Sequence, residues 1–107
     1  MKTPIETIGT HTATGAGARV SKLGAEGPQD GIKIADKTRI VQISGIAGGT
    51  IIKIEASIDN ANWADYVTGI SADCIKILDD GPLFIRSNCT TYGSGTCTVR
   101  VQKFIQD

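Results

Sequence analysis

The side chains that could carry out catalysis are few and lie far apart in this sequence. His11 is the only histidine, and it is far along the chain from the three cysteines at positions 74, 89 and 97. A nucleophile needs a base beside it, and a zinc site needs closely spaced Cys or His ligands, and this spacing provides neither. We therefore expect His11 to be a solvated polar residue, and the sequence predicts no enzyme, no cofactor and no metal site.

Two acidic clusters have the composition of turns rather than of a cation site. The segment 59–65, DNANWAD, offers oxygen ligands, but it lacks the glycine and the bidentate Glu that an EF-hand loop needs at fixed positions. The segment 79–82, DDGP, is also a common turn composition. The sequence predicts chain reversals at both places.

The aromatic and basic residues suggest binding rather than turnover. Trp63 and Tyr66 are candidates for a platform on which a sugar ring stacks. A lone Trp in a chain with five aromatic residues is more often part of the core or its lid. Arg86 and Arg100 fall on the polar side of their predicted strands, as an interface patch or as solvated surface. A carbohydrate-binding module is thus one functional hypothesis.

Length and composition favour one all-β domain. The chain has 107 residues, with sixteen isoleucines, twelve threonines and thirteen glycines, a bias toward sheets and turns. Eleven basic residues balance eleven acidic ones, so we expect no nucleic-acid partner. No apolar stretch resembles a signal peptide or approaches the ~18 residues of a membrane span. We expect a soluble protein made in the cytosol, with no membrane partner.

The clearest strand signals lie between residues 50 and 101. Positions 52, 54, 56 and 58 alternate with polar residues, and the turn at 59–62 predicts a hairpin. A second hairpin is predicted at 83–101, around Gly93-Ser94-Gly95. Its register places Cys89 and Cys97 on the apolar face, as free thiols in preference to a disulfide. That face contains Ile85, Cys89, Cys97, Val99 and Val101.

Further strands are predicted at 32–35, 41–44, 64–67 and 73–78, with a hairpin-type turn at Gly48-Gly49. No helix of convincing length is expected. Seven to eight strands spaced by about ten residues are typical of sandwiches and barrels. We therefore predict an all-β antiparallel β-sandwich that is jelly-roll-like.

The first thirty residues contain many glycines and few large aliphatic side chains. Such a segment buries too little apolar surface to become ordered alone, so it is either a flexible tail or an extended arm that lies on another surface. We divide the chain into an extended N-terminal arm, 1–30, and a β-sandwich domain, 31–107. The candidate interface residues are Ile5, Ile8, Val20 and Leu23 on the arm, with Arg86 and Arg100 on the sandwich.

Several of these motifs resemble those of small β-sandwich virion proteins of tailed bacteriophages. The resemblance covers about half of the chain: a strand that ends in a Ser-x-Asp turn and Trp, a Pro-aromatic-Ile-Arg strand, and a Gly-Ser-Gly hairpin. The matching positions are Ser57, Asp59, Trp63, Pro82, Phe84, Ile85, Arg86, Tyr92, Gly93 and Gly95. Asn60-Ala61-Asn62 replaces the usual glycine-containing turn, and Cys89 and Cys97 replace aliphatic residues.

The resemblance implies a virion structural protein without an active site, most consistent with a capsid cement or decoration protein that stabilises the head. A head-to-tail connector or a tail-associated protein is the alternative in the same class. The implied partners are the major capsid protein, other virion proteins and further copies of the chain, with a trimer favoured. The implied location is the virion, after synthesis in the host cytoplasm.

Overall fold

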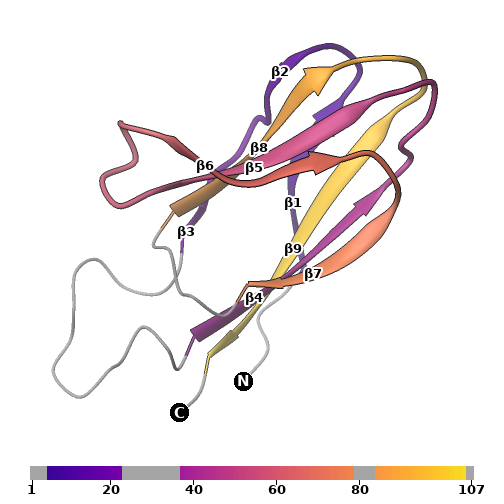
Figure 1. Cartoon of the computed structure of the whole chain (residues 1–107). Helices are drawn as coiled ribbons and strands as arrows, with labels where there is room; N and C mark the ends of the chain where they lie inside the picture. The colour runs from indigo at the N-terminus through magenta and orange to yellow at the C-terminus, as the bar shows by residue number, and fades with distance from the viewer. Residues whose placement is uncertain (1–4, 23–36, 79–83, 106–107) are drawn as a thin grey trace, which may run out of the picture.

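The computed structural model shows two antiparallel sheets packed face to face, and it describes residues 5–22, 37–78 and 84–105 (Figure 1). Sheet A has the strand order β1-β9-β4-β7. Sheet B has the order β2-β8-β5-β6, and β3 also pairs with β8. The described residues contain no helix. The strands are β1 (Glu6–His11), β2 (Gly15–Ala16), β3 (Ser21–Lys22), β4 (Lys37–Ser44), β5 (Ile51–Ser57), β6 (Ala64–Ile70), β7 (Cys74–Leu78), β8 (Phe84–Thr91) and β9 (Cys97–Ile105).

The order of the strands is that of a jelly roll. β2 and β3 pair with successive parts of the same edge of β8, so they occupy one position in sheet B. With that position counted once, the chain pairs its first strand with its last and continues inward: β1 with β9, β2 and β3 with β8, β4 with β7, and β5 with β6. This nested pairing is the arrangement of two Greek keys. The predicted jelly-roll-like sandwich is confirmed.

The core lies between the two sheets and consists of residues with period-two spacing. On β8 and β9, the residues predicted to face inward are almost completely buried, and Ile85 and Val99 are 0% exposed. Each buried Val or Ile side chain stabilises the fold by about 1.5–3 kcal/mol relative to leaving it in water. The core residues are Ile8, Val41, Ile43, Ile52, Ile54, Ile70, Leu78, Ile85, Cys89, Cys97, Val99 and Val101.

The predicted hairpin at 83–101 is wrong, although its apolar face is right. β8 belongs to sheet B and β9 to sheet A, so the glycine-rich segment between them carries the chain across the sandwich. A Cβ at Gly93 would collide with the backbone carbonyl of Gly48, so glycine is required by the close approach of two loops. Gly48-Gly49 likewise joins strands of different sheets. The predicted hairpin and the observed crossover bury the same residues, because a sandwich has two inner faces.

The first predicted hairpin is confirmed, since β5 and β6 pair antiparallel in sheet B. The reversal between them includes Asn60, which adopts a left-handed φ of 59°. Ile58, predicted on the apolar face, is instead 85% exposed because it lies beyond the end of β5. The predicted strand at 32–35 and the turn at 79–82 lie outside the described residues.

The prediction of an N-terminal arm outside the sandwich is wrong for residues 5–22. β1 pairs with β9 from Glu6 opposite Val101 to His11 opposite Cys97, and the segment that follows pairs with β8. Glycine makes this fit possible, since a Cβ at Gly17 would collide with the carbonyl oxygen of Ile8. Composition underestimated how well ordered this segment is, because its strands gain backbone hydrogen bonds from the strands with which they pair. Residues 1–4 and 23–30 lie outside the described residues.

Candidate functional site

The predicted interface residues do not form one surface. Ile8 is 0% exposed and belongs to the core, whereas Ile5 is 64% exposed and Val20 is half-buried. Leu23 lies outside the described residues. Arg86 is on β8 of sheet B and Arg100 is on β9 of sheet A, so the two arginines do not share a face as the hairpin prediction required.

The outer face of sheet B carries a closed network of charged and polar groups. Arg86 Nε donates to Glu55 Oε1 at 2.8 Å, and Asn88 Nδ2 donates to the same oxygen at 3.1 Å. Lys53 Nζ lies 3.5 Å from Glu55 Oε2 and 2.8 Å from Asp65 Oδ1. Burial would raise the pKa of Glu55, but the hydrogen bonds from Arg86 and Asn88 hold it below its ordinary value. This network satisfies its own charges.

Trp63 and Tyr66, the candidate sugar-stacking residues, lie in different surroundings and are both half-buried. The guanidinium carbon of Arg86 lies 4.4 Å from the centroid of the Trp63 ring, so a cation covers one face of the indole. Tyr66 is half-buried and packs against the core. The two rings therefore serve different parts of the sandwich.

The outer face of sheet A differs because it is nearly free of charge. Beyond the paired positions Thr38 and Phe104 at one end, the strand registers place three rows of outward side chains across the sheet. The first row is Gln102, Ile40 and Ile77; the second is Thr7, Arg100, Gln42 and Ile75; the third is Thr10, Thr98 and Ser44. Among these described residues Arg100 is the only charged one. The centres of protein–protein interfaces are typically depleted in charged residues.

An isoleucine patch, Ile40, Ile75 and Ile77, lies at the β4–β7 side of this face. Ile75 is 62% exposed and Ile77 is 67% exposed, and Ile77 is directly opposite Ile40 in the register. Sequence reasoning found this strand but not the orientation of its isoleucines. Lys76, opposite the buried Val41, falls on the core-facing side of β7 in the register, but it is exposed because β7 is an edge strand.

His11 and Ser87 form a buried pair that links the two sheets. His11 Nε2 lies 2.8 Å from Ser87 Oγ, and the residues are 4% and 0% exposed. Burial lowers the pKa of His11, which favours the neutral ring. A Cβ added at Gly9 or Gly17 would collide with Ser87 Oγ, so the hydroxyl is closely covered. The pair joins the sheets and has no room for a substrate, and the prediction that His11 is solvated is wrong.

The three cysteines are free thiols. Cys89 and Cys97 are buried in the core and Cys74 is half-buried. Burial raises the pKa of Cys89 and Cys97, which keeps both as unreactive thiols. The prediction that these two side chains pack as small apolar groups is confirmed.

The carboxylate of Asp59 is used to hold its own turn. Asp59 Oδ1 accepts hydrogen bonds from the backbone N–H groups of Ala61 and Asn62, both at 2.9 Å, and from Ser57 Oγ at 2.8 Å. These donors lower the pKa of Asp59. The turn predicted at 59–62 is confirmed, and within the described ranges no group of three or more His, Cys, Asp or Glu could hold a metal ion.

Sequence reasoning also missed a buried arginine. Arg39 is 0% exposed, its Nε donates to Ser21 Oγ at 3.1 Å, and its Nη2 donates to the Ser21 carbonyl at 3.0 Å. Burial lowers its pKa to about 10. The alternation of Val41 and Ile43 on the core side of β4 was the available signal, since it extends two residues back to Arg39.

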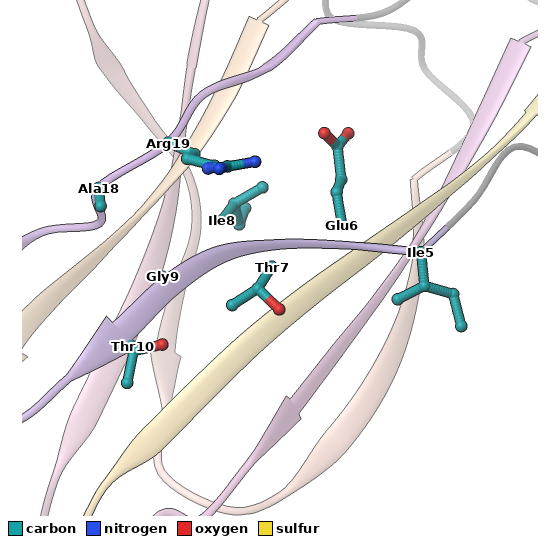
Figure 2. Close-up of a pocket in the computed structure, with 8 residues that line it drawn as sticks. All are labelled: Ile5, Glu6, Thr7, Ile8, Gly9, Thr10, Ala18 and Arg19. Atoms are coloured by element: carbon teal, nitrogen blue, oxygen red, sulfur yellow. The ribbon is translucent and has the colours of Figure 1, made fainter.

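An open groove of about 490 Å³ runs beside β1, between that strand and residues 18–19 (Figure 2). Figure 2 shows Glu6 and Ile8 on one side of β1 and Ile5 and Thr7 on the other. Glu6 Oε1 lies 3.7 Å from Lys103 Nζ. Its polar lining consists of the Glu6 carboxylate, the Arg19 guanidinium and the hydroxyls of Thr7 and Thr10, without a histidine or cysteine.

Comparison with protein-family models and with curated proteins gave no match. In the part of the chain that the structure describes, no helix is suited to crossing a membrane.

Proposed function

We propose that this chain is a virion structural protein of a tailed bacteriophage, a capsid cement or decoration protein that stabilises the head. It acts by binding to other virion proteins, with the major capsid protein as its principal partner, and it resides in the virion. The observation that carries the proposal is the nearly uncharged outer face of sheet A, with its exposed isoleucine patch on a jelly-roll sandwich. A head-to-tail connector or tail-associated subunit is the alternative within the same class.

The polar groups of the sandwich support a binding role over a catalytic one. The His11–Ser87 pair is enclosed, the Glu55 carboxylate is neutralised by its neighbours, and Asp59 holds a turn. These three described groups are thus engaged in holding the fold. Contacts through side chains on a rigid sheet suit a protein that fastens other subunits together.

The architecture supports the proposal as an analogy. Jelly rolls are used in viral capsid proteins, and also in lectins and cupins, so the fold alone does not assign a role. At Trp63, the candidate for a lectin-like site, Arg86 covers one face of the ring and reduces the surface open to a sugar. The motifs that resemble those of phage β-sandwich proteins favour the virion role.

Co-sedimentation with phage shells that lack this protein tests the proposal. The purified chain should pellet with the shells in saturable amounts and raise their melting temperature, and an immobilised-glycan column should not retain it. Image reconstruction of complete particles should then locate the subunit on the head. If the chain stays in the supernatant and is absent from purified particles, the proposal is refuted.

A further inference from the structure

We propose that the outer face of sheet A binds the same face of a second copy of this chain, as a reversible two-fold dimer centred on β4. This inference rests on the proposed structural role, because it assigns the outer face of sheet A to contacts between copies of the chain on one shell. It proposes a two-fold dimer where the resemblance implied a trimer. The dimer is nevertheless measured on the isolated chain, so the two proposals fail separately.

The edge of β7 is a poor place for a second chain to add a strand. Lys76 lies on the inward side of this edge strand, opposite Val41, where a charge opposes edge-to-edge pairing. At the other exposed edge on this side of the sandwich, the β5–β6 ladder contains two irregularities in register. Such irregularities also discourage strand addition. Contact through the face is therefore favoured over contact through either of these two edges.

The charge on the face favours a second copy as its partner. Among the described outward residues of the three rows there is no carboxylate, and Arg100 is the single cation. A partner surface rich in acids or bases would lose hydration against this face without gaining ion pairs. The same face of another copy, with its isoleucines, threonines and glutamines, carries no such mismatch.

A two-fold axis parallel to β4 gives complementary rows. The register places Ile40 and Gln42 on β4, with β7 and β9 as its neighbours on either side. The axis then sets Ile40 against Ile40 of the second copy, Ile77 against Gln102, and Ile75 against the aliphatic stem of Arg100. The two Arg100 side chains lie on opposite sides of the axis, separated by two strand spacings of about 4.8 Å and a sheet spacing of about 10 Å. That separation exceeds the Debye length of about 8 Å.

The size of the contact predicts weak association. Three strands span about 14 Å, and about 20 Å of their length gives a footprint of about 300 Å². A standard stable interface buries about 800 Å² of accessible surface on each partner. The isolated chain should therefore dimerise with a dissociation constant above about 10 μM. Many copies fixed on one shell would strengthen the contact through effective concentration.

Sedimentation velocity over a range of protein concentrations tests the dimer. The wild-type chain should shift from monomer to dimer as concentration rises, and Ile77→Lys should weaken association at least tenfold while leaving the melting temperature unchanged. Thr90→Lys places the same charge on an exposed residue of sheet B and should dimerise like the wild type. A wild type that stays monomeric to about 1 mM, or an Ile77→Lys variant that dimerises normally, would overturn the proposal.

Cross-linking tests the position of the axis. In a Cys74→Ser background, Gln42→Cys should form a covalent dimer with a short bifunctional maleimide, because Gln42 faces its own copy across a sheet spacing of about 10 Å, which is too wide for a disulfide. Thr90→Cys should remain monomeric. Equal cross-linking of both variants would overturn the arrangement. If the wild type is monomeric and Ile77→Lys instead loses binding to shells, the patch serves a shell protein, which overturns self-association and leaves the proposed function standing.

Discussion

Replacing Ile8 with alanine tests whether the N-terminal segment is part of the sandwich. Ile8 is 0% exposed and contacts the core, so the substitution removes buried apolar atoms and leaves a cavity. Ile→Ala changes at such sites cost about 2–5 kcal/mol, depending on how far the cavity collapses. The melting midpoint of a domain of this size falls by about 4–8 °C per kcal/mol, so we expect a decrease of at least about 8 °C.

The matched control is Ile5→Ala, three residues earlier. Ile5 is 64% exposed, and a surface substitution of this kind should change stability by less than about 0.5 kcal/mol. Urea unfolding of both variants can be followed by the fluorescence of Trp63, the only tryptophan. If Ile8→Ala were as stable as Ile5→Ala, residues 5–11 would not contribute to the core, and the assignment of β1 would be refuted.

Three further perturbations test the interior and the loops. His11 has a pKa below its ordinary value of 6.5, so the unfolded chain binds more protons below that pH. The stabilising contribution of His11 should be complete above about pH 6.5 and be lost as pH falls below it. In His11→Gln, the free energy of unfolding should lack this dependence on pH. An unchanged dependence would contradict the burial of a neutral His11. Thiol labelling of the native protein should be fast only at the half-buried Cys74 and should reach three equivalents in denaturant. Fast labelling of all three thiols in the native protein would show that Cys89 and Cys97 are not buried. Gly93→Ala should destabilise more than Gly49→Ala in thermal melts, because its Cβ meets backbone whereas Gly49 adds only the cost of a positive φ; equal effects would argue against the contact between the two loops.

The sequence was informative where structure depends on neighbours along the chain. The alternation on β8 and β9 identified Ile85 and Val99 as core residues, and the Asp59 turn was recognisable from the preference of Asp and Asn for reversals. These features arise within about ten residues. They do not depend on which strand lies beside which.

The candidate site was less predictable because it depends on partners that are distant in sequence. The predicted hairpin of β8 and β9 would make Arg86 and Arg100 neighbours, but the two strands belong to different sheets. Their actual partners, Glu55 on β5 and Ser44 on β4, lie 31 and 56 residues away. The burial of His11 had no local signal, since it requires the hydroxyl of Ser87 from the opposite sheet.

The sequence by itself determined that the chain forms an all-β sandwich and which residues of most strands are apolar on one side, because period-two alternation is a local property. The tertiary structure decided which sheet each strand joins, since pairing is set by the fit of whole faces and close backbone contacts between distant segments. It also decided the orientation of β7. Alternation alone favours burying Ile75 and Ile77, yet the pairing of β7 with β4 turns them outward and places Lys76 on the inward side.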